Sequence, residues 1–198
     1  TSLSLSELEA HIKNGQPLPE KSCLITFDDG YRDNYTEMYP LLKKYGLKAN
    51  IFLVAGFLKP GKKDPDEYLR IEDIKLMSSE GSVEFGLHSL KHDSYNELSL
   101  EQIRDDVQAC RKIFDQAGIV YQPSLAFTYG AFPKHDRLKR LSMFQLFDQL
   151  GINVAYRIGN RINQLPIGEK FLVQRLDIRG DEAFRRFKRA LRTGKKLI

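Results

Sequence analysis

Short apolar segments alternate with amphipathic segments along most of this chain, and that alternation restricts the folds open to it. The apolar segments have the length and the bounding residues of strands, and they span residues 23–27, 48–57, 82–89, 124–130, 151–158 and 170–178. The amphipathic segments predict helices over residues 4–15, 33–45, 71–81, 99–118, 136–150 and 181–192. Buried strands that alternate with such helices are typical of a parallel sheet, open or closed into a barrel.

Local signals support this division of the chain. Ser99 and Gln102 have the spacing of a capping box at the start of the longest predicted helix. Pro40 predicts a kink or a restart within the second helix, because proline removes a helical N–H. Residues 59–68 are charged and rich in Pro and Gly, which predicts a loop. With 198 residues and no long linker, we expect one domain over residues 1–198.

The bulk composition excludes some classes of protein and leaves others open. No run of about 18 apolar residues is present, so the sequence predicts no membrane-spanning helix. The net charge of +5 permits an anionic partner without requiring one. Nothing resembles an RNA-binding motif or a Gly-rich phosphate loop, so we expect no nucleic-acid partner. The oligomeric state is left open.

The start of the sequence says little about the location of the protein in the cell. The first residues, TSLSLSELEA, are polar and acidic, so no signal peptide is visible. The chain starts with Thr rather than Met, and a cytoplasmic location stays open. Cys23 and Cys110 are far apart in the sequence, and we expect both to be buried free thiols.

Polar residues with catalytic chemistry follow three of the predicted strands. Asp28 and Asp29 come directly after the first strand, His88 ends the third and His92 follows it, and Tyr129 ends the fourth. In parallel α/β folds the carboxyl ends of the strands form the site, so these side chains are expected on the same face. The sequence therefore predicts one cluster from three separate segments.

This set of side chains suits a divalent metal ion. Two histidines and a carboxylate form a known metal-binding set with positions left open for water or substrate. A cation would also explain why two neighbouring aspartates end an apolar strand. It would bind one of them and lower the pKa of a water from about 15.7 to about 7, leaving the second to accept a proton as general base.

Taken singly, each signal has a simpler explanation. The DDG of residues 28–30 is a common turn sequence. The HxxxH spacing of His88 and His92 lacks the Glu of the HExxH metalloproteases. Only four histidines exist, however, and two of them sit at a strand end. Of the others, His11 is expected on the surface of the first helix, and His135 lies just past Tyr129, near the predicted site.

The sequence resembles the polysaccharide deacetylase family, carbohydrate esterase family four. The resemblance rests on TFDDG at 26–30, on HSLKH at 88–92 and on the spacing between them. FTYGAF at 127–132 is similar to the third family motif, which usually contains aromatic–Pro–aromatic–Gly. The resemblance covers roughly residues 5–190, and the similarity is greatest to the branch that acts on biofilm exopolysaccharides and envelope glycans.

The resemblance implies a fold, a reaction and roles for residues. The fold is a distorted (β/α) barrel of about seven mostly parallel strands, and the reaction is hydrolysis of N-acetyl groups on an aminosugar polymer or glycan, which releases acetate. Asp28 would be the general base, and the Tyr129 N–H would help to hold the oxyanion. Asp29, His88 and His92 would bind a divalent metal, usually zinc. A place in the cell envelope or outside the cell follows by family analogy.

The chain also departs from the family pattern. Thr128 replaces the usual Pro of the third motif, and the Arg that normally precedes it is absent, so Arg175 from the last strand is the candidate to approach the base. The late Leu–x–His motif, which carries the general acid, is absent as well. His135 or Asp177 would serve instead, or a substrate group or water. The residues expected to contact substrate are Tyr31, Gly130, Phe132 and Arg175.

Two alternative functions stay open, and the missing acid motivates the first of them. One is a weak or inactive relative that binds glycan without hydrolysing it, and the other is a metal-dependent amidase acting on a non-sugar substrate.

The last predicted helix is basic and amphipathic. Seven Lys or Arg lie between Arg185 and Lys196, and Phe184, Phe187 and Leu191 share one helical face. Such a helix can make a weak contact with an anionic membrane or glycan. A closing helix with a solvated basic face is the simpler interpretation, and the sequence favours it.

Overall fold

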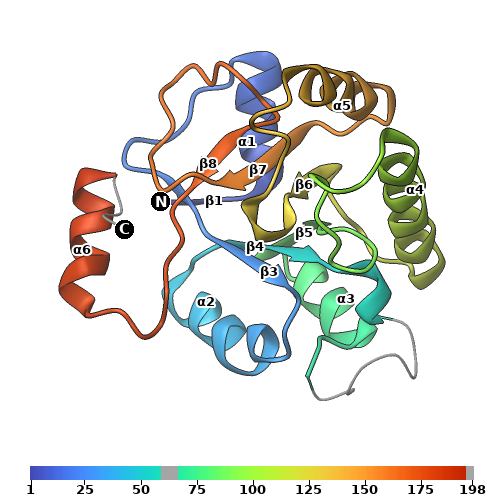
Figure 1. The fold of residues 1–198 in the computed structure, drawn as a ribbon. Coiled ribbons are helices and arrows are strands. Elements are labelled where there is room, and N and C mark those ends of the chain that lie inside the picture. The colour runs from blue at the N-terminus through green and yellow to red at the C-terminus, as the bar shows by residue number, and fades with distance from the viewer. Residues whose placement is uncertain (59–66, 195–198) are drawn as a thin grey trace.

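The computed structural model describes residues 1–58 and 67–194 (Figure 1). Most of the loop expected at 59–68 lies outside these residues. The strands are β1 (Ser2–Leu3), β2 (Cys23–Leu24), β3 (Thr26–Asp29), β4 (Ala49–Leu53), β5 (Val83–Leu87), β6 (Ser124–Ala126), β7 (Val154–Ile158) and β8 (Val173–Arg175). The helices are α1 (Leu5–Asn14), α2 (Tyr39–Tyr45), α3 (Ile71–Ser79), α4 (Leu100–Ala117), α5 (Arg137–Gln149) and α6 (Phe184–Thr193). No helix within the described residues is both long enough and apolar enough to cross a membrane.

Six strands form one parallel sheet in the order β3-β4-β5-β6-β7-β8, so every neighbour in the sheet is also the next strand in the chain. Helices α2 to α5 lie around the outside of this curled sheet (Figure 1). The predicted α/β class with parallel strands is confirmed. The main sheet has six strands instead of about seven, because β1 and β2 pair separately as a short two-stranded parallel sheet.

Side chains alternate between two cores along each central strand. Ile51 and Leu53 of β4 pack outward against the helices, in a core that also holds Phe85, Phe114 and Phe147. Phe52, between the first two, points into the curl and meets Tyr156 of β7 at a ring-centroid distance of 5.2 Å. This period of two is what a parallel sheet packed on both faces requires.

Gly86 makes room for the inner core. A Cβ at this position would lie 2.7 Å from the Phe52 ring and 2.9 Å from the Ser124 carbonyl oxygen. Only a residue without a side chain lets the Phe52 ring fill the space beside β5.

Helix α1 closes the curl where the strands begin. Leu5 and Leu8 belong to the inner core. Glu9 accepts hydrogen bonds from the Ser124 hydroxyl and the Asn153 amide, each at 2.7 Å. Burial raises the pKa of Glu9, and although these two hydrogen bonds oppose the shift, the nearby Glu84 carboxylate adds to it.

Helix ends follow their sequence signals closely. The Ser99 side chain accepts a hydrogen bond from the Gln102 N–H and the Gln102 side chain accepts one from the Ser99 N–H, which confirms the capping box of α4. Pro40 stands in the first turn of α2, directly after a π-helical segment over Asn34–Met38. The chain therefore restarts its helix at this proline.

Two expectations about the strands were wrong. The apolar runs overestimate strand length: the run at 48–57 contains β4 and then a 3₁₀ turn over Ala55–Leu58, and the run at 170–178 pairs only over Val173–Arg175. Cys23 is exposed although its neighbours are apolar, because β2 lies at an edge and pairs with β1 alone. Cys110 is buried, as expected.

Candidate metal centre and active site

The carboxyl ends of the strands bring together three potential metal ligands. Asp29 is the last residue of β3, and His88 and His92 follow β5. The Asp29 Oδ1 atom lies 3.4 Å from His88 Nε2 and 3.1 Å from His92 Nε2. One ligand atom from each residue falls within 4.8 Å of the other two. The structure thus assembles the set expected from the strand-end rule.

The chemistry of these atoms fits a cation. Asp29 Oδ1 is buried and accepts no hydrogen bond from any residue that the structure describes, an arrangement that is costly unless a positive partner is present. His88 Nδ1 lies 2.8 Å from the Ala126 carbonyl oxygen, which can only accept. The proton therefore sits on Nδ1 and the Nε2 lone pair faces Asp29, as a metal-ligating histidine requires.

Electrostatics keep His88 ready to act as a ligand. Burial lowers the pKa of His88 below its ordinary value of 6.5, even though the Asp28 carboxylate opposes the shift. The imidazole is therefore neutral around neutral pH. A neutral imidazole is the form that binds metals.

His92 is held by the turn that follows β6. Its Nδ1 lies 3.0 Å from the Tyr129 hydroxyl oxygen, and the two rings meet edge to face at 4.6 Å between centroids. His92 and Tyr129 both have positive φ, at 67° and 57°. Non-glycine residues adopt this conformation at an energetic cost that often marks a functional site.

Asp28 is tied to the far edge of the sheet. Arg175, at the end of β8, donates to both carboxylate oxygens of Asp28, from Nη1 at 2.7 Å and from Nη2 at 2.8 Å. Burial raises the pKa of Asp28, but the Arg175 guanidinium together with His88 and His92 lowers it, and the net shift is downward. The pair fixes both the charge and the orientation of Asp28.

A third carboxylate supports the turn that carries the histidines. Asp106 of α4 accepts the Leu90 N–H at 2.9 Å and the Tyr95 hydroxyl at 2.5 Å. Asp106 was not among the residues singled out from the sequence. A signal was present, because Asp106 lies between Ile103 and Cys110 on the apolar face of the helix, where an acidic residue is unusual.

The residues expected to contact substrate divide into two groups. Tyr31 is 42% exposed and stacks on Tyr68 at 5.3 Å, so one ring face is open to a ligand. Phe132 is only 8% exposed and belongs to the core, and Arg157 lies over its ring at 4.8 Å, so little of the ring is left to contact a substrate. Gly130 has a φ of +64°, and a Cβ there would lie 2.8 Å from Ile158. The backbone conformation and the packing therefore both require a glycine at this position.

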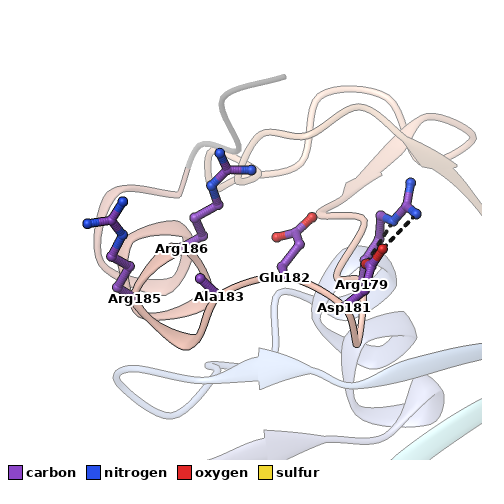
Figure 2. Close-up of a pocket in the computed structure, with 6 residues that line it drawn as sticks. All are labelled: Arg179, Asp181, Glu182, Ala183, Arg185 and Arg186. Carbon is purple, nitrogen blue, oxygen red and sulfur yellow. Dashed lines mark hydrogen bonds and ion pairs between the residues drawn. The ribbon is translucent and has the colours of Figure 1, made fainter.

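The two candidates for the general acid, His135 and Asp177, lie on separate segments of the chain. His135 is exposed in the loop before α5. Asp177 follows β8 by two residues, and its N–H donates to Asn160 Oδ1 at 3.0 Å. A separate hollow of about 460 Å³ lies at the start of α6, and none of the metal-site residues lines it. Figure 2 shows its lining residues, which are Arg179, Asp181, Glu182, Ala183, Arg185 and Arg186.

The family model for polysaccharide deacetylase matches residues 15–144, which is more than half of the chain. The chain belongs to the polysaccharide deacetylase family. The matched residues include both aspartates, both histidines and Tyr129, and they end before Arg175.

Two relatives show how far the similarity to other polysaccharide deacetylases extends. The chain is 41% identical over 96 residues to YxkH of Bacillus subtilis (strain 168), whose name describes it as a polysaccharide deacetylase. The aligned residues cover 48% of this chain and 32% of YxkH. The chain is 28% identical over 138 residues to the poly-beta-1,6-N-acetyl-D-glucosamine N-deacetylase of Staphylococcus aureus (strain MRSA252), covering 65% and 47%. The chain thus spans less than half the length of either relative.

Solved structures of deacetylases share the fold. The Streptococcus pyogenes deacetylase PplD, solved with acetate, superposes with a TM-score of 0.80 at 19% identity, over 96% of this chain and 79% of PplD. The de-N-acetylase of Aggregatibacter actinomycetemcomitans gives 0.75 at 21% identity, over 96% and 82%. Because the sequence identities are this low, the similarity to these structures shows a shared fold only.

Proposed function

We propose that this protein is a metal-dependent hydrolase that removes N-acetyl groups from an aminosugar-containing polysaccharide or glycan and releases acetate. The observation that carries the proposal is the pairing of two neighbouring carboxylates with different partners. Asp29 shares one buried oxygen with two histidine Nε2 atoms, while Asp28 is held by Arg175. One carboxylate is thereby suited to bind a cation and the other to accept a proton.

Asp29, His88 and His92 would hold the metal, and zinc is the ion that a set of one carboxylate and two imidazoles favours. When bound, the ion would polarise the acetamide carbonyl and lower the pKa of a nearby water. The proton on His88 Nδ1, fixed by the Ala126 carbonyl, keeps the His88 Nε2 lone pair available to it.

The chain's own groups would handle the proton and the substrate. Asp28 is unprotonated because the Arg175 guanidinium lowers its pKa, so it can accept the proton of the water that attacks the acetamide carbon. The Tyr129 N–H would donate to the oxyanion, an effect often worth about 3 kcal/mol per donor. The open face of Tyr31 would contact a sugar ring, and the amine departs after His135, Asp177 or water supplies a proton.

One relative and the family name support a glycan as substrate. The Staphylococcus aureus relative is named for an acetylated glucosamine polymer, and the family as a whole is named for polysaccharides. We place the protein in the cell envelope or outside the cell on this basis.

Acetate release tests the proposal directly. The purified chain should release acetate from N-acetylglucosamine oligomers, lose that activity in a chelator and regain it with added zinc. Asp28→Asn should keep the metal, measured by elemental analysis, and lose the acetate. Full activity in the chelator, or in Asp28→Asn, would contradict the assigned roles.

A glycan-binding protein without turnover is the second candidate. It is motivated by the absence from the sequence of the late Leu–x–His motif that carries the general acid in the family. Its signature is sugar binding, measured by calorimetry, with no acetate released at any metal content.

A further inference from the structure

Helix α6 stands apart from the sheet (Figure 1), and the residues on its two sides differ sharply in character. The ten residues FRRFKRALRT carry five basic side chains and no acidic one. At 100° per residue, Phe184, Phe187, Ala190 and Leu191 fall on one side and the basic residues on the other. Such a helix needs a surface on which to bury its apolar side.

The protein covers only part of that apolar side. Ala190 is buried, and just past the helix the Gly194 carbonyl accepts the Ile162 N–H at 2.9 Å. Phe184 and Leu191 remain 65% and 59% exposed. A helix whose only task was to close the fold would bury these two side chains. Two large apolar side chains on one side of a single helix thus face solvent together.

Basic side chains border the exposed apolar residues directly. Lys188 follows Phe184 by one helical turn, and its Nζ lies 4.8 Å from the centre of the Phe184 ring. Arg192 continues the same edge of the helix, and Figure 2 shows Arg185 extending outward from the first turn. A long basic side chain beside an exposed aromatic ring can reach an anionic headgroup while the ring enters the apolar layer.

We propose that α6 binds the surface of an anionic lipid bilayer, with Phe184 and Leu191 inserted and Lys188 and Arg192 at the headgroups. An anionic polysaccharide would satisfy the positive charge but would leave the apolar residues without an apolar phase to enter. The deacetylated product of the proposed reaction carries amines and would be repelled by this helix. The inference depends only on α6, and it stands whether or not the metal cluster is catalytic.

Vesicle co-sedimentation of the full chain tests the proposal. The protein should bind mixed phosphatidylglycerol–phosphatidylcholine vesicles, bind pure phosphatidylcholine weakly, and be released by salt. Lys188→Gln and Arg192→Gln should each lower the partition coefficient by roughly fivefold. The double variant Phe184→Ser/Leu191→Ser should lower it by roughly tenfold or more.

Matched controls separate this helix from the rest of the surface. Val120 and Leu138 are even more exposed than Phe184, and Lys112 and Lys134 are exposed and basic. The double variants Val120→Ser/Leu138→Ser and Lys112→Gln/Lys134→Gln should bind the mixed vesicles as the natural sequence does.

Three outcomes would overturn the proposal. They are no binding to the mixed vesicles, equal losses in the control variants, and retention on an anionic polysaccharide without any vesicle binding. Circular dichroism spectra identical to that of the natural sequence would show that each variant is folded.

Discussion

Replacing Tyr95 with phenylalanine should destabilise the protein through a single oxygen atom. Tyr95 is 2% exposed, and its hydroxyl donates to Asp106 Oδ1 at 2.5 Å. Phenylalanine fills the same space without the hydroxyl, so packing is preserved. Among the described residues, Asp106 then keeps the Leu90 N–H and a weak contact with the Cys110 thiol at 3.8 Å.

The size of the effect follows from burial and charge. Burial raises the pKa of Asp106 and the Tyr95 hydrogen bond opposes that shift, so the bond favours the ionised carboxyl. A hydrogen bond to a charged group contributes roughly 1.5–3 kcal/mol. We therefore expect Tyr95→Phe to lower the free energy of unfolding by about 2 kcal/mol, which corresponds to a Tm lower by roughly 4–8 °C for a chain of this size.

Urea unfolding followed by circular dichroism measures this loss, and the protein supplies its own control. Tyr156 is 0% exposed, and its hydroxyl lies near the Ser124 side chain without a hydrogen bond of normal geometry within the described part of the chain. Tyr156→Phe removes the same oxygen from an equally buried ring and should change stability by less than about 0.5 kcal/mol. Hydrogen exchange at the Leu90 amide should accelerate in Tyr95→Phe only.

Equal losses of stability in the two variants would refute the reasoning, because burial of the ring would then matter and the Asp106 contact would not. An unchanged exchange rate at Leu90 would show that Asp106 does not hold the histidine turn in place.

Three further substitutions probe the contact between Arg175 and Asp28, the inner core beside Gly86, and Glu9 of helix α1. Arg175→Lys keeps a positive charge but loses the two-point contact with Asp28, so kcat for acetate release should fall about a hundredfold, with metal content unchanged. Gly86→Ala should lower the free energy of unfolding by about 1–3 kcal/mol, read from urea midpoints, because its Cβ would meet the Phe52 ring. Burial raises the folded-state pKa of Glu9, so its stabilising contribution is complete below pH 4.5 and is lost as pH rises through the raised value. Glu9→Gln should therefore lose less stability, relative to the natural sequence, at neutral pH than below pH 4.5, and equal losses in urea unfolding at both would contradict this.

Local chemistry made part of the structure predictable. The capping box at Ser99 and the restart at Pro40 depend on neighbouring residues only, and both are where the sequence indicates. The gathering of Asp29, His88 and His92 followed from one general property of parallel sheets, that strand ends share an edge. Their roles in binding and catalysis stay predictions.

Features that depend on the three-dimensional course of the sheet were harder to predict. The exposure of Cys23 depends on which strand lies beside β2, and the burial of Phe132 depends on Arg157 covering its ring. Asp106 was overlooked because its partners, Leu90 and Tyr95, lie in a turn whose course no periodicity describes. Strand ends were overestimated because apolar residues continue into turns.

The contact between Arg175 and Asp28 joins the first and last strands of a sheet whose edges share no backbone ladder within the described residues. The carboxylate that holds the two edges together, Asp28, is also the proposed general base. Any motion that separates β3 from β8 would move the Arg175 guanidinium away from Asp28, and the Asp28 carboxylate would then lose its orientation. The rate of the proposed reaction should therefore fall as the distance between the two edges of the sheet increases.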